Sequence, residues 1–260
     1  MKDSSVNKIN EDLEFSNWIR SFYNAKAKDI SDKGYEYARW FSTKEKRRQY
    51  KFTTISLLHH FKDIDFKNCL EIGCGPGTWT KLLIKKYPNS RFTCLDISKE
   101  MIKQFKRNVK SKKVKIIVNN FLDHDFKNKK YDLIFCSRAI EYIPDKRKII
   151  SKFYRLMNEN GKGIIVTSPP HPIILNIKKA FGKKIDREHT QRISVKRLNE
   201  LLEKAGFINI KFYPILFIDL LFVPTTFLFK KLYKKRLGLF SRIFSTSYIV
   251  KFERSKNEKL

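Results

Sequence analysis

The glycine-rich loop after the first apolar run of this chain constrains its fold more than any other feature. The run ends at Ile72 and leads into Gly73, Gly75 and Gly77, and an amphipathic helix is predicted to begin near Thr78. Because glycine has no Cβ, these positions can adopt positive φ and leave backbone N–H groups facing a ligand above the end of a strand. The pattern predicts a ligand-binding turn between a strand and a helix, with an ordinary tight turn as the alternative.

Two acidic residues near this loop indicate which ligand it binds. A dinucleotide-binding turn has the spacing G-x-G-x-x-G, but here Gly77 comes one residue early, and Glu71 lies two residues before the first glycine. A carboxylate there suits a cationic or amine-bearing ligand better than a pyrophosphate. Asp96 ends the next apolar run, about twenty residues past the glycines, where an acid can accept both hydroxyls of a ribose. Together these residues predict an adenosine-type ligand.

Short apolar runs alternate with helical patterns from residue 69 onward. Strands are expected at residues 69–72, 91–95, 114–118, 131–136, 163–168, 208–213 and 247–252, and helices at 78–87, 98–109, 145–158 and 194–206. Runs of β-branched and aromatic residues separated by helices indicate an α/β fold, with a parallel sheet covered on both faces. Ligands of such sheets bind beyond the carboxyl ends of the strands, where the glycines and Asp96 lie.

Residues 70–77, 96–98, 131–136 and 161–166 resemble, in this order, the successive motifs of class I S-adenosylmethionine-dependent methyltransferases. The resemblance extends over residues 65–215. It implies a Rossmann-like, mostly parallel seven-stranded sheet with an antiparallel last strand. Within that superfamily, residues 188–190, followed by a helix and residues 205–207, are similar to the small-molecule branch that includes the quinone-biosynthesis O-methyltransferases.

The resemblance implies S-adenosyl-L-methionine as the cofactor. Ile97 and Met101 are expected to cover the adenine ring, and the amide oxygen of Asn120 to accept a hydrogen bond from the adenine amino group. The residues expected to bind the cofactor are Glu71, Gly73, Gly75, Gly77, Asp96, Ile97, Asn120, Phe121 and Ser137.

We expect one methyltransferase domain with additions at both ends. Residues 11–62 show helical spacing of apolar residues, and the resemblance implies that the N-terminal extension, residues 1–64, closes as a lid over cofactor and acceptor. Residues 65–254 are expected to form the domain, with an apolar insertion at 214–244, and residues 255–260 a disordered basic tail. The lid candidates are Tyr35, Tyr37, Trp40, Arg47 and Arg48. The alternative for the aromatic residues is simple packing on the sheet.

Methyl transfer from a sulfonium is a direct displacement, so most of the acceleration comes from alignment, and an oxygen acceptor also needs a base. Many small-molecule relatives have a histidine where this chain has Tyr142. Arg138 and Tyr142 occupy two positions at which metal-assisted quinone methyltransferases have ligands, so no metal is expected. His189 is the candidate general base, with a structural histidine as the alternative. Tyr142 and Glu141 complete the expected catalytic set.

Residues 214–229 contain a single charged residue, Asp219, and basic residues follow at 230–236. This apolar stretch is interrupted by Pro224 and falls short of the roughly twenty residues that cross a bilayer. It is expected either to lie in the membrane interface with its lysines against anionic head groups, or to roof an apolar acceptor pocket. Both alternatives indicate a hydrophobic or lipid-like acceptor.

The formal net charge of +30 raises the question of a nucleic-acid partner. Lysines spread over nearly every predicted helix favour solvated surfaces, so nucleic acid is the less favoured partner.

The polar N-terminus and the absence of C-x-x-C spacing indicate a cytoplasmic protein, with the inner face of the membrane as an alternative location. The leading function is methyl transfer to a small hydrophobic or lipid-like acceptor. The alternatives are an RNA or protein methyltransferase and a non-catalytic, cofactor-binding membrane-docking module.

Overall fold

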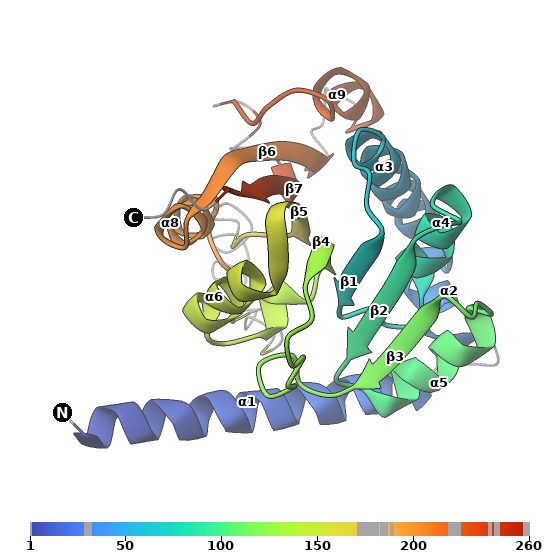
Figure 1. Ribbon diagram of the computed structural model, residues 1–260. Coiled ribbons are helices and arrows are strands. Elements are labelled where there is room, and N and C mark those ends of the chain that lie inside the picture. Colours follow the sequence, from blue (N-terminus) through green and yellow to red (C-terminus); the bar gives the residue numbers. More distant parts are fainter. Residues whose placement is uncertain are drawn as a thin grey trace.

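The computed structural model describes residues 2–28, 33–170, 182, 187, 190–217, 225–238, 241 and 245–256. A seven-stranded sheet forms the middle of the molecule (Figure 1). In chain order its strands are β1 (Asn68–Ile72), β2 (Arg91–Asp96), β3 (Val114–Val118), β4 (Tyr131–Ser137), β5 (Met157–Thr167), β6 (Phe207–Phe217) and β7 (Ser245–Arg254).

The strands lie in the order β3-β2-β1-β4-β5-β7-β6, and the neighbours are parallel except for β7, which runs antiparallel to both β5 and β6. The chain order reverses between β1 and β4. In sheets of this type ligands bind outside the carboxyl ends of the strands at such a switch point. The predicted Rossmann-like, mostly parallel α/β fold is confirmed.

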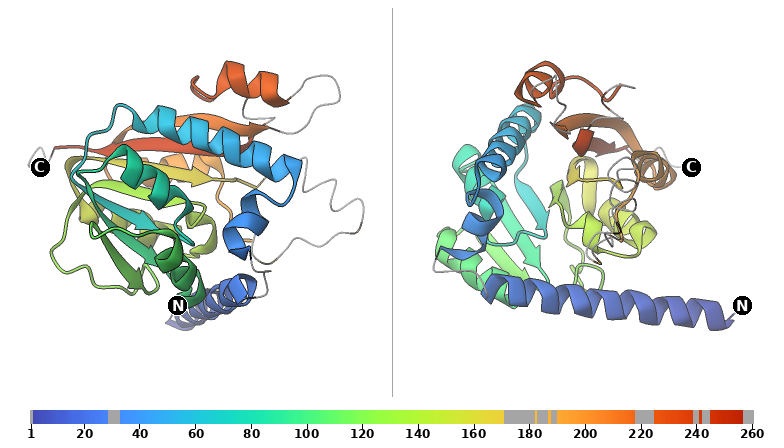
Figure 2. Two further views of the ribbon diagram at one scale, coloured as in Figure 1. Left: turned by 90° about the vertical axis from the view of Figure 1, so that its right-hand side faces the viewer. Right: turned by 180° about the vertical axis from the view of Figure 1, so that it is seen from behind.

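Helices cover both faces of the sheet (Figure 2). On one face pack α3 (Lys44–Phe61), α4 (Thr78–Lys86) and α5 (Lys99–Asn108), and on the other α6 (Lys146–Leu156) and α8 (Val195–Lys204). Helix α8 is capped at both ends: the Ser194 hydroxyl accepts a hydrogen bond from the N–H of Arg197, and Gly206 follows the helix with a φ of 88°.

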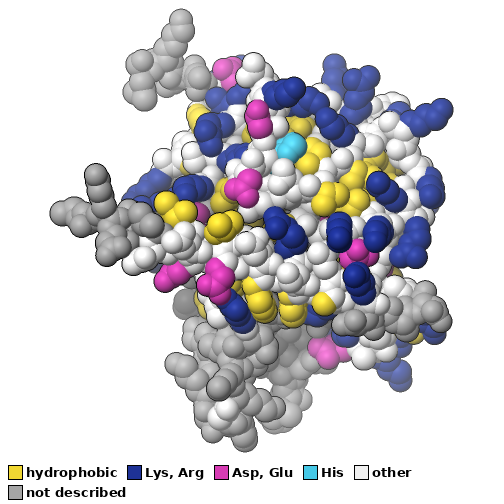
Figure 3. Space-filling view, turned by 90° about the horizontal axis from the view of Figure 1, so that it is seen from below, with side chains coloured by type: hydrophobic (Ala, Val, Ile, Leu, Met, Phe, Trp, Pro, Cys, Tyr) yellow, Lys and Arg dark blue, Asp and Glu magenta, His cyan; other side chains and the backbone are white. Residues whose placement is uncertain are grey.

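The N-terminal helices lie across the carboxyl ends of the strands. Helix α1 (Lys2–Lys28) runs along this edge (Figure 1) and is followed by α2 (Gly34–Trp40). The side-chain oxygen of Asn24 accepts hydrogen bonds from the Ser98 hydroxyl at 2.8 Å and the Glu100 N–H at 3.3 Å, which attaches α1 to the start of α5. Seen from this side, lysine and arginine side chains are scattered among hydrophobic ones (Figure 3). The spread of charge agrees with solvated helix surfaces.

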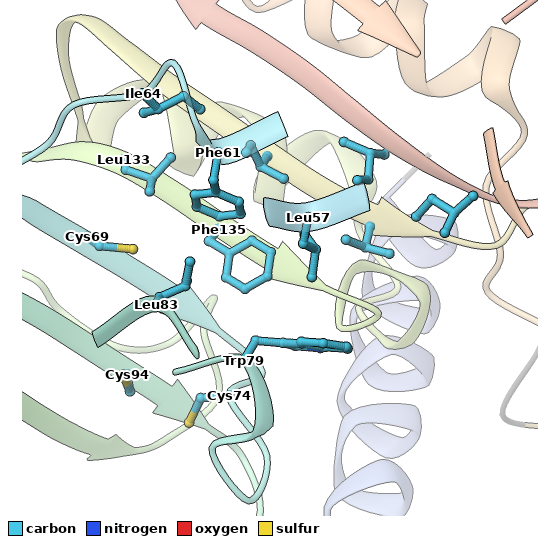
Figure 4. Close-up of a cluster of buried hydrophobic side chains, with 14 of the residues drawn as sticks. Leu57, Phe61, Ile64, Cys69, Cys74, Trp79, Leu83, Cys94, Leu133 and Phe135 are labelled. Atoms are coloured by element: carbon cyan, nitrogen blue, oxygen red, sulfur yellow. The ribbon is translucent and has the colours of Figure 1, made fainter. Parts of the chain in front are cut away.

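The hydrophobic core is divided between the two faces of the sheet. Because successive strand residues point to opposite faces, Cys69 packs toward α3 and α4, while Leu70 and Ile72 pack toward α6. Figure 4 shows the first cluster, in which Phe61 of α3 meets Phe135 of β4 edge to face, with ring centroids 5.3 Å apart. All four cysteines are buried and free.

Residues 214–217, the start of the expected apolar insertion, belong to β6 and pair with β7, and Ile215 is fully buried. The strand continues past its predicted end because Ile215, Leu216 and Phe217 are all buried in one core cluster. Helix α9 (Thr225–Leu232) follows and packs against α3 and β6. Helix α6 ends at Leu156, two residues before its predicted end, because Met157 already pairs with Tyr131 as the first residue of β5.

Within the described residues, no helix is both long and apolar enough to cross a membrane.

Candidate active site

A cavity of about 390 Å³ lies between the carboxyl ends of β1, β2 and β4 and the N-terminal helices α1 and α2. Its volume is within the usual range for small-molecule sites. The described residues that line it include these from the predicted set: Gly73, Gly75, Asp96, Ile97, Met101, Asn120, Phe121, Ser137, Glu141 and Tyr142. The structure therefore brings most of the predicted site together.

The glycine loop supplies shape to the cavity rather than bare N–H groups. Gly73, Gly75 and Gly77 all have positive φ, as predicted. Their N–H groups are already bonded: that of Gly73 to the Leu95 carbonyl at 2.7 Å, that of Gly75 to Asp96 Oδ2 at 2.8 Å, and that of Gly77 to the Cys74 carbonyl at 3.0 Å. The expectation that these amides face a ligand is therefore wrong, because two of them attach the loop to β2 and that of Gly77 closes a turn within the loop.

Asp96 ends β2 with its carboxylate against this loop. One oxygen accepts from the Gly75 N–H and the other from the Ser98 N–H at 2.9 Å. Burial raises the pKa of Asp96, and these backbone hydrogen bonds oppose the rise. Each carboxylate oxygen can accept about two bonds, so acceptor capacity remains on the cavity side for the two hydroxyls of a ribose. Asp96 thus fits the nucleoside part of S-adenosyl-L-methionine.

The part of the cavity lined by the residues that follow β2 and β3 is mostly apolar. Ile97, Met101 and Phe121 line it, and all three are apolar surfaces suited to an aromatic base. Asn120 lies beside them, and its amide oxygen accepts a hydrogen bond from the Leu122 N–H at 3.1 Å. A carbonyl oxygen can accept a second hydrogen bond, so the amide oxygen of Asn120 can still accept the predicted bond from an adenine amino group.

Glu71 and Gly77 do not line the cavity. The Glu71 side chain is buried behind the loop, where its carboxylate accepts a hydrogen bond from the Thr80 hydroxyl at 2.6 Å. Burial raises the pKa of Glu71 to about 7. Gly77 is the N-cap of α4, and a Cβ there would come within 2.5 Å of Val109. Both residues hold α4 in place, so the structure does not support the direct cofactor contacts predicted for them.

The predicted catalytic residues Glu141 and Tyr142 lie in a short 3-10 helix, η1 (Ile140–Tyr142), after β4. The Tyr142 ring lines the cavity and meets the ring of Tyr23 from α1 at 5.3 Å. The Glu141 carboxylate accepts a hydrogen bond from the Ser168 N–H at 2.6 Å and forms ion pairs with two arginines, Arg138 and Arg192. These bonds occupy Glu141 and favour a structural role. His189 lies outside the described residues.

Several residues that line the cavity were absent from the predicted set. They are Tyr23 and Lys26 of α1, Arg39 of α2, and Arg192. Tyr35 and Trp40 of the predicted lid also line it, whereas Tyr37 is exposed and the Arg47 side chain donates to the Phe41 carbonyl. Arg39 follows Tyr35 by four residues, and this spacing could have placed it on the same face.

Residues 69–161 match the family model described as "Methyltransferase domain". The malonyl-[acyl-carrier protein] O-methyltransferase 1 of Ilyobacter polytropus is 34% identical over 96 residues, which cover 36% of this chain and 35% of that protein. The corresponding enzyme of Paenibacillus sp. is 29% identical over 154 residues, 54% of this chain and 55% of that protein. The chain thus spans between about a third and just over half of the length of these relatives.

Solved structures share the fold. Magnesium protoporphyrin IX methyltransferase from Synechocystis PCC 6803, with S-adenosylhomocysteine bound, has a TM-score of 0.62 at 14% identity and covers 92% of this chain and 99% of its own. The N-methyltransferase NodS from Bradyrhizobium japonicum, also with S-adenosylhomocysteine, has a TM-score of 0.58 at 13% identity, covering 91% and 98%. Residues 69–161 therefore carry a methyltransferase domain, as the sequence predicted, and the chain has the fold of solved methyltransferase structures that hold S-adenosylhomocysteine.

Proposed function

We propose that this chain binds S-adenosyl-L-methionine in the 390 Å³ cavity and transfers its methyl group to a small molecule. The observation that carries the proposal is the position of the Asp96 carboxylate, fixed by Gly75 and Ser98 at the mouth of the cavity with Ile97 and Met101 beside it. A ribose hydrogen-bonded to Asp96 puts the attached base against Ile97 and Met101 and the sulfonium end toward β4.

The cofactor supplies a methyl group on a positively charged sulfur. The acceptor's lone pair forms the new bond to the methyl carbon as the carbon–sulfur bond breaks and its electron pair stays on sulfur. Residues of this chain contribute by holding the acceptor in line and excluding water. Aromatic side chains of the cavity suit that role, among them Tyr23, Tyr35, Tyr142 and Trp40. Their rings support an acceptor with an apolar body, in keeping with the hydrophobic acceptor expected from the sequence.

An acceptor hydroxyl or amine must lose a proton during transfer, and His189 stays our candidate for that base. Glu141 also lines the cavity but is tied to Ser168, Arg138 and Arg192, which leaves Tyr142 as the other described candidate. The phenol of Tyr142 can position an acceptor oxygen by a hydrogen bond.

The first test is S-adenosylhomocysteine binding by the wild-type chain and by Asp96→Asn, measured by calorimetry. We expect the substitution to cost about 2 kcal/mol, on the order of 30-fold in affinity, through weakened hydrogen bonds to the ribose. Asp123→Asn, at an exposed position outside the cavity, is the control and should bind normally. Equal affinity of wild type and Asp96→Asn would remove the basis of the proposal.

The second test follows a radiolabelled methyl group from the cofactor into a fractionated cell extract. Label in small molecules supports the proposed function, and sensitivity to Asp96→Asn ties it to this site. Label in RNA or protein would favour the macromolecular alternative. Tight cofactor binding without label in any fraction would favour a non-catalytic module.

We also propose a weak contact between α9 and anionic membranes. It is supported by the exposed Phe227 and by the exposed basic residues that follow, Lys230, Lys231, Lys234, Lys235 and Arg236. Each cation near an anionic surface contributes about 1 kcal/mol. Flotation with phosphatidylserine vesicles should decrease for Lys230→Glu/Lys234→Glu and not for Lys204→Glu on α8. Equal binding by all three proteins would exclude α9 as the contact.

A further inference from the structure

The end of the cavity next to β4 has an excess of positive charge. Among the described lining residues, the carboxylate of Glu141 faces two guanidinium groups: Arg138 Nη1 lies 3.5 Å from Oε1 and Arg192 Nε lies 3.7 Å from Oε2. One negative charge cannot balance two positive ones. Arg192 Nε is also buried without a hydrogen-bond partner, and so is Arg138 Nε. Buried donors of this kind are costly unless a ligand accepts from them.

Arg39 adds a third guanidinium from α2. It is half-buried, its charge centre lies 4.1 Å from the centre of the Trp40 ring, and no carboxylate within the described ranges pairs with it. Arg39, Arg138 and Arg192 line the same cavity. Burial lowers the pKa of Arg39, and the charge of Arg138 lowers it further. An anion bound in this cavity would be stabilised by such guanidinium groups.

The backbone of Arg138 is strained in a way that favours a role for its side chain. Arg138 has a φ of 64°, a left-handed conformation that costs a residue with a Cβ about 1 to 2 kcal/mol. Its N–H donates to the Val166 carbonyl at 2.8 Å, and its guanidinium donates to the Ser168 hydroxyl. Strain of this kind, held by several bonds at the end of a strand, is typical of functional positions.

The cofactor does not remove this excess of charge. S-adenosyl-L-methionine carries a sulfonium, an ammonium and one carboxylate, so it brings a net charge of about +1 into the cavity at neutral pH. Even if one arginine takes the cofactor's carboxylate, the positive charge of the loaded site increases. The missing negative charge must come from the other ligand of the site.

We propose that the methyl acceptor carries an anionic group, a carboxylate or a phosphate, that is bound by Arg138 and Arg192 with Arg39 facing them. This inference rests on the proposed methyl transfer and names the acceptor class. The anion is an anchor and not the methylated atom, because guanidinium hydrogen bonds stabilise an anion and lower its nucleophilicity. The aromatic rings then hold the apolar body of the acceptor, between the anchor and the sulfonium.

The test is a titration of the full chain saturated with S-adenosylhomocysteine, at constant ionic strength. Sodium malonate and inorganic phosphate are the anionic probes, and malonamide is the neutral one. We expect one saturable site for at least one anion and none for malonamide. The stronger of the two anions distinguishes a carboxylate anchor from a phosphate anchor.

Two variants then locate the anion. Arg192→Gln and Arg39→Gln should each weaken anion binding at least tenfold; neither side chain forms a hydrogen bond within the described structure, so both variants should fold. Arg197→Gln, whose guanidinium pairs with Glu200 on the exposed side of α8, should bind the anion normally. The inference is overturned if neither anion binds, or if both variants bind as the wild type does. Because S-adenosylhomocysteine binding is measured first, its absence would instead count against the proposed function.

Discussion

The glycines of the loop after β1 have different reasons to be glycine. A Cβ on Gly73 would lie 2.3 Å from the Cβ of Ala139, so this residue permits close packing of the β1 and β4 ends. A Cβ on Gly75 would meet no atom within 4 Å, because it would point into the open space of the cavity. One glycine therefore serves folding and the other serves ligand access.

This difference predicts that one alanine substitution mainly weakens ligand binding and the other mainly lowers stability. Gly75→Ala should cost only the left-handed backbone penalty, about 1 kcal/mol, but should weaken S-adenosylhomocysteine binding at least tenfold by occupying its space. Gly73→Ala should lower the free energy of unfolding by more than about 2 kcal/mol, because backbone near Ala139 must move. Urea unfolding measures the free energy of unfolding, and calorimetry measures the affinity for S-adenosylhomocysteine. Equal stability of the two variants would contradict this division.

Glu71 links stability to pH. The pKa of Glu71 is about 7 in the folded protein against 4.5 for an unperturbed group, so the folded state binds the proton more tightly. The stabilisation is complete below about pH 4.5 and is lost as pH rises toward 7, by about 3 kcal/mol at 1.36 kcal/mol per pKa unit.

The free energy of unfolding should fall by about 3 kcal/mol less between pH 5 and pH 8 in Glu71→Gln than in the wild type. The reason is that an amide cannot ionise, while its oxygen still accepts the hydrogen bond from the Thr80 hydroxyl. Urea unfolding at both pH values measures this. Glu203→Gln, at an exposed position on α8, is the matched control. If wild type and Glu71→Gln show the same pH dependence, the pKa of Glu71 is not raised in the folded protein.

At the scale of elements, α9 is held to α3 by aromatic stacking. Phe229 lies 4.1 Å from Phe52 of α3 with nearly parallel rings, and it also stacks on Tyr233 at 4.7 Å. Phe227, two residues before Phe229 in the same helix, is exposed. Among the described residues α9 contributes nothing to the lining of the cavity, so it does not roof the acceptor site.

Phe229→Ala should therefore destabilise the protein by about 3 kcal/mol, as for other buried phenylalanines, and leave S-adenosylhomocysteine affinity unchanged. Phe227→Ser should change neither quantity by more than about 0.5 kcal/mol. Thermal unfolding with and without the ligand gives both numbers. A loss of ligand affinity in Phe229→Ala would show that α9 supports the site after all.

The elements that the sequence predicted well are those specified by local patterns. Asp96 and the glycines could be placed because a strand end and a tight turn are set by neighbouring residues. Glu71 was predicted to contact the cofactor, whereas the strand period puts it on the same face as Cys69, which is toward α4. The spacing puts Arg39 on the same face of α2 as Tyr35, but the sequence could not show that this face meets the cavity, because α2 is positioned by contacts distant in sequence, such as the Tyr35 N–H donating to Gln104 at 3.0 Å.

At the scale of the whole molecule, a second cavity gathers six cationic side chains away from the proposed cofactor site. It has a volume of about 600 Å³ at the amino ends of β1 to β4 and is lined by Arg91, Lys112, Lys113, Lys115, Lys129 and Lys130 among others. The charge of Lys115 lowers the pKa of Lys129. A polyanion is the natural ligand of such crowded cations. Because β1 spans five residues, at about 3.3 Å each, this cavity lies about 16 Å from the glycine loop.

We therefore predict that RNA binds weakly and without sequence preference, with an affinity that falls steeply as salt rises. The reversal Lys112→Glu/Lys129→Glu should weaken RNA binding at least tenfold and leave S-adenosylhomocysteine affinity unchanged, because the two cavities lie at opposite ends of the strands. Filter binding across a salt series measures the first quantity, and calorimetry in the presence of transfer RNA measures the second. Competition between RNA and S-adenosylhomocysteine would contradict this separation of the two sites.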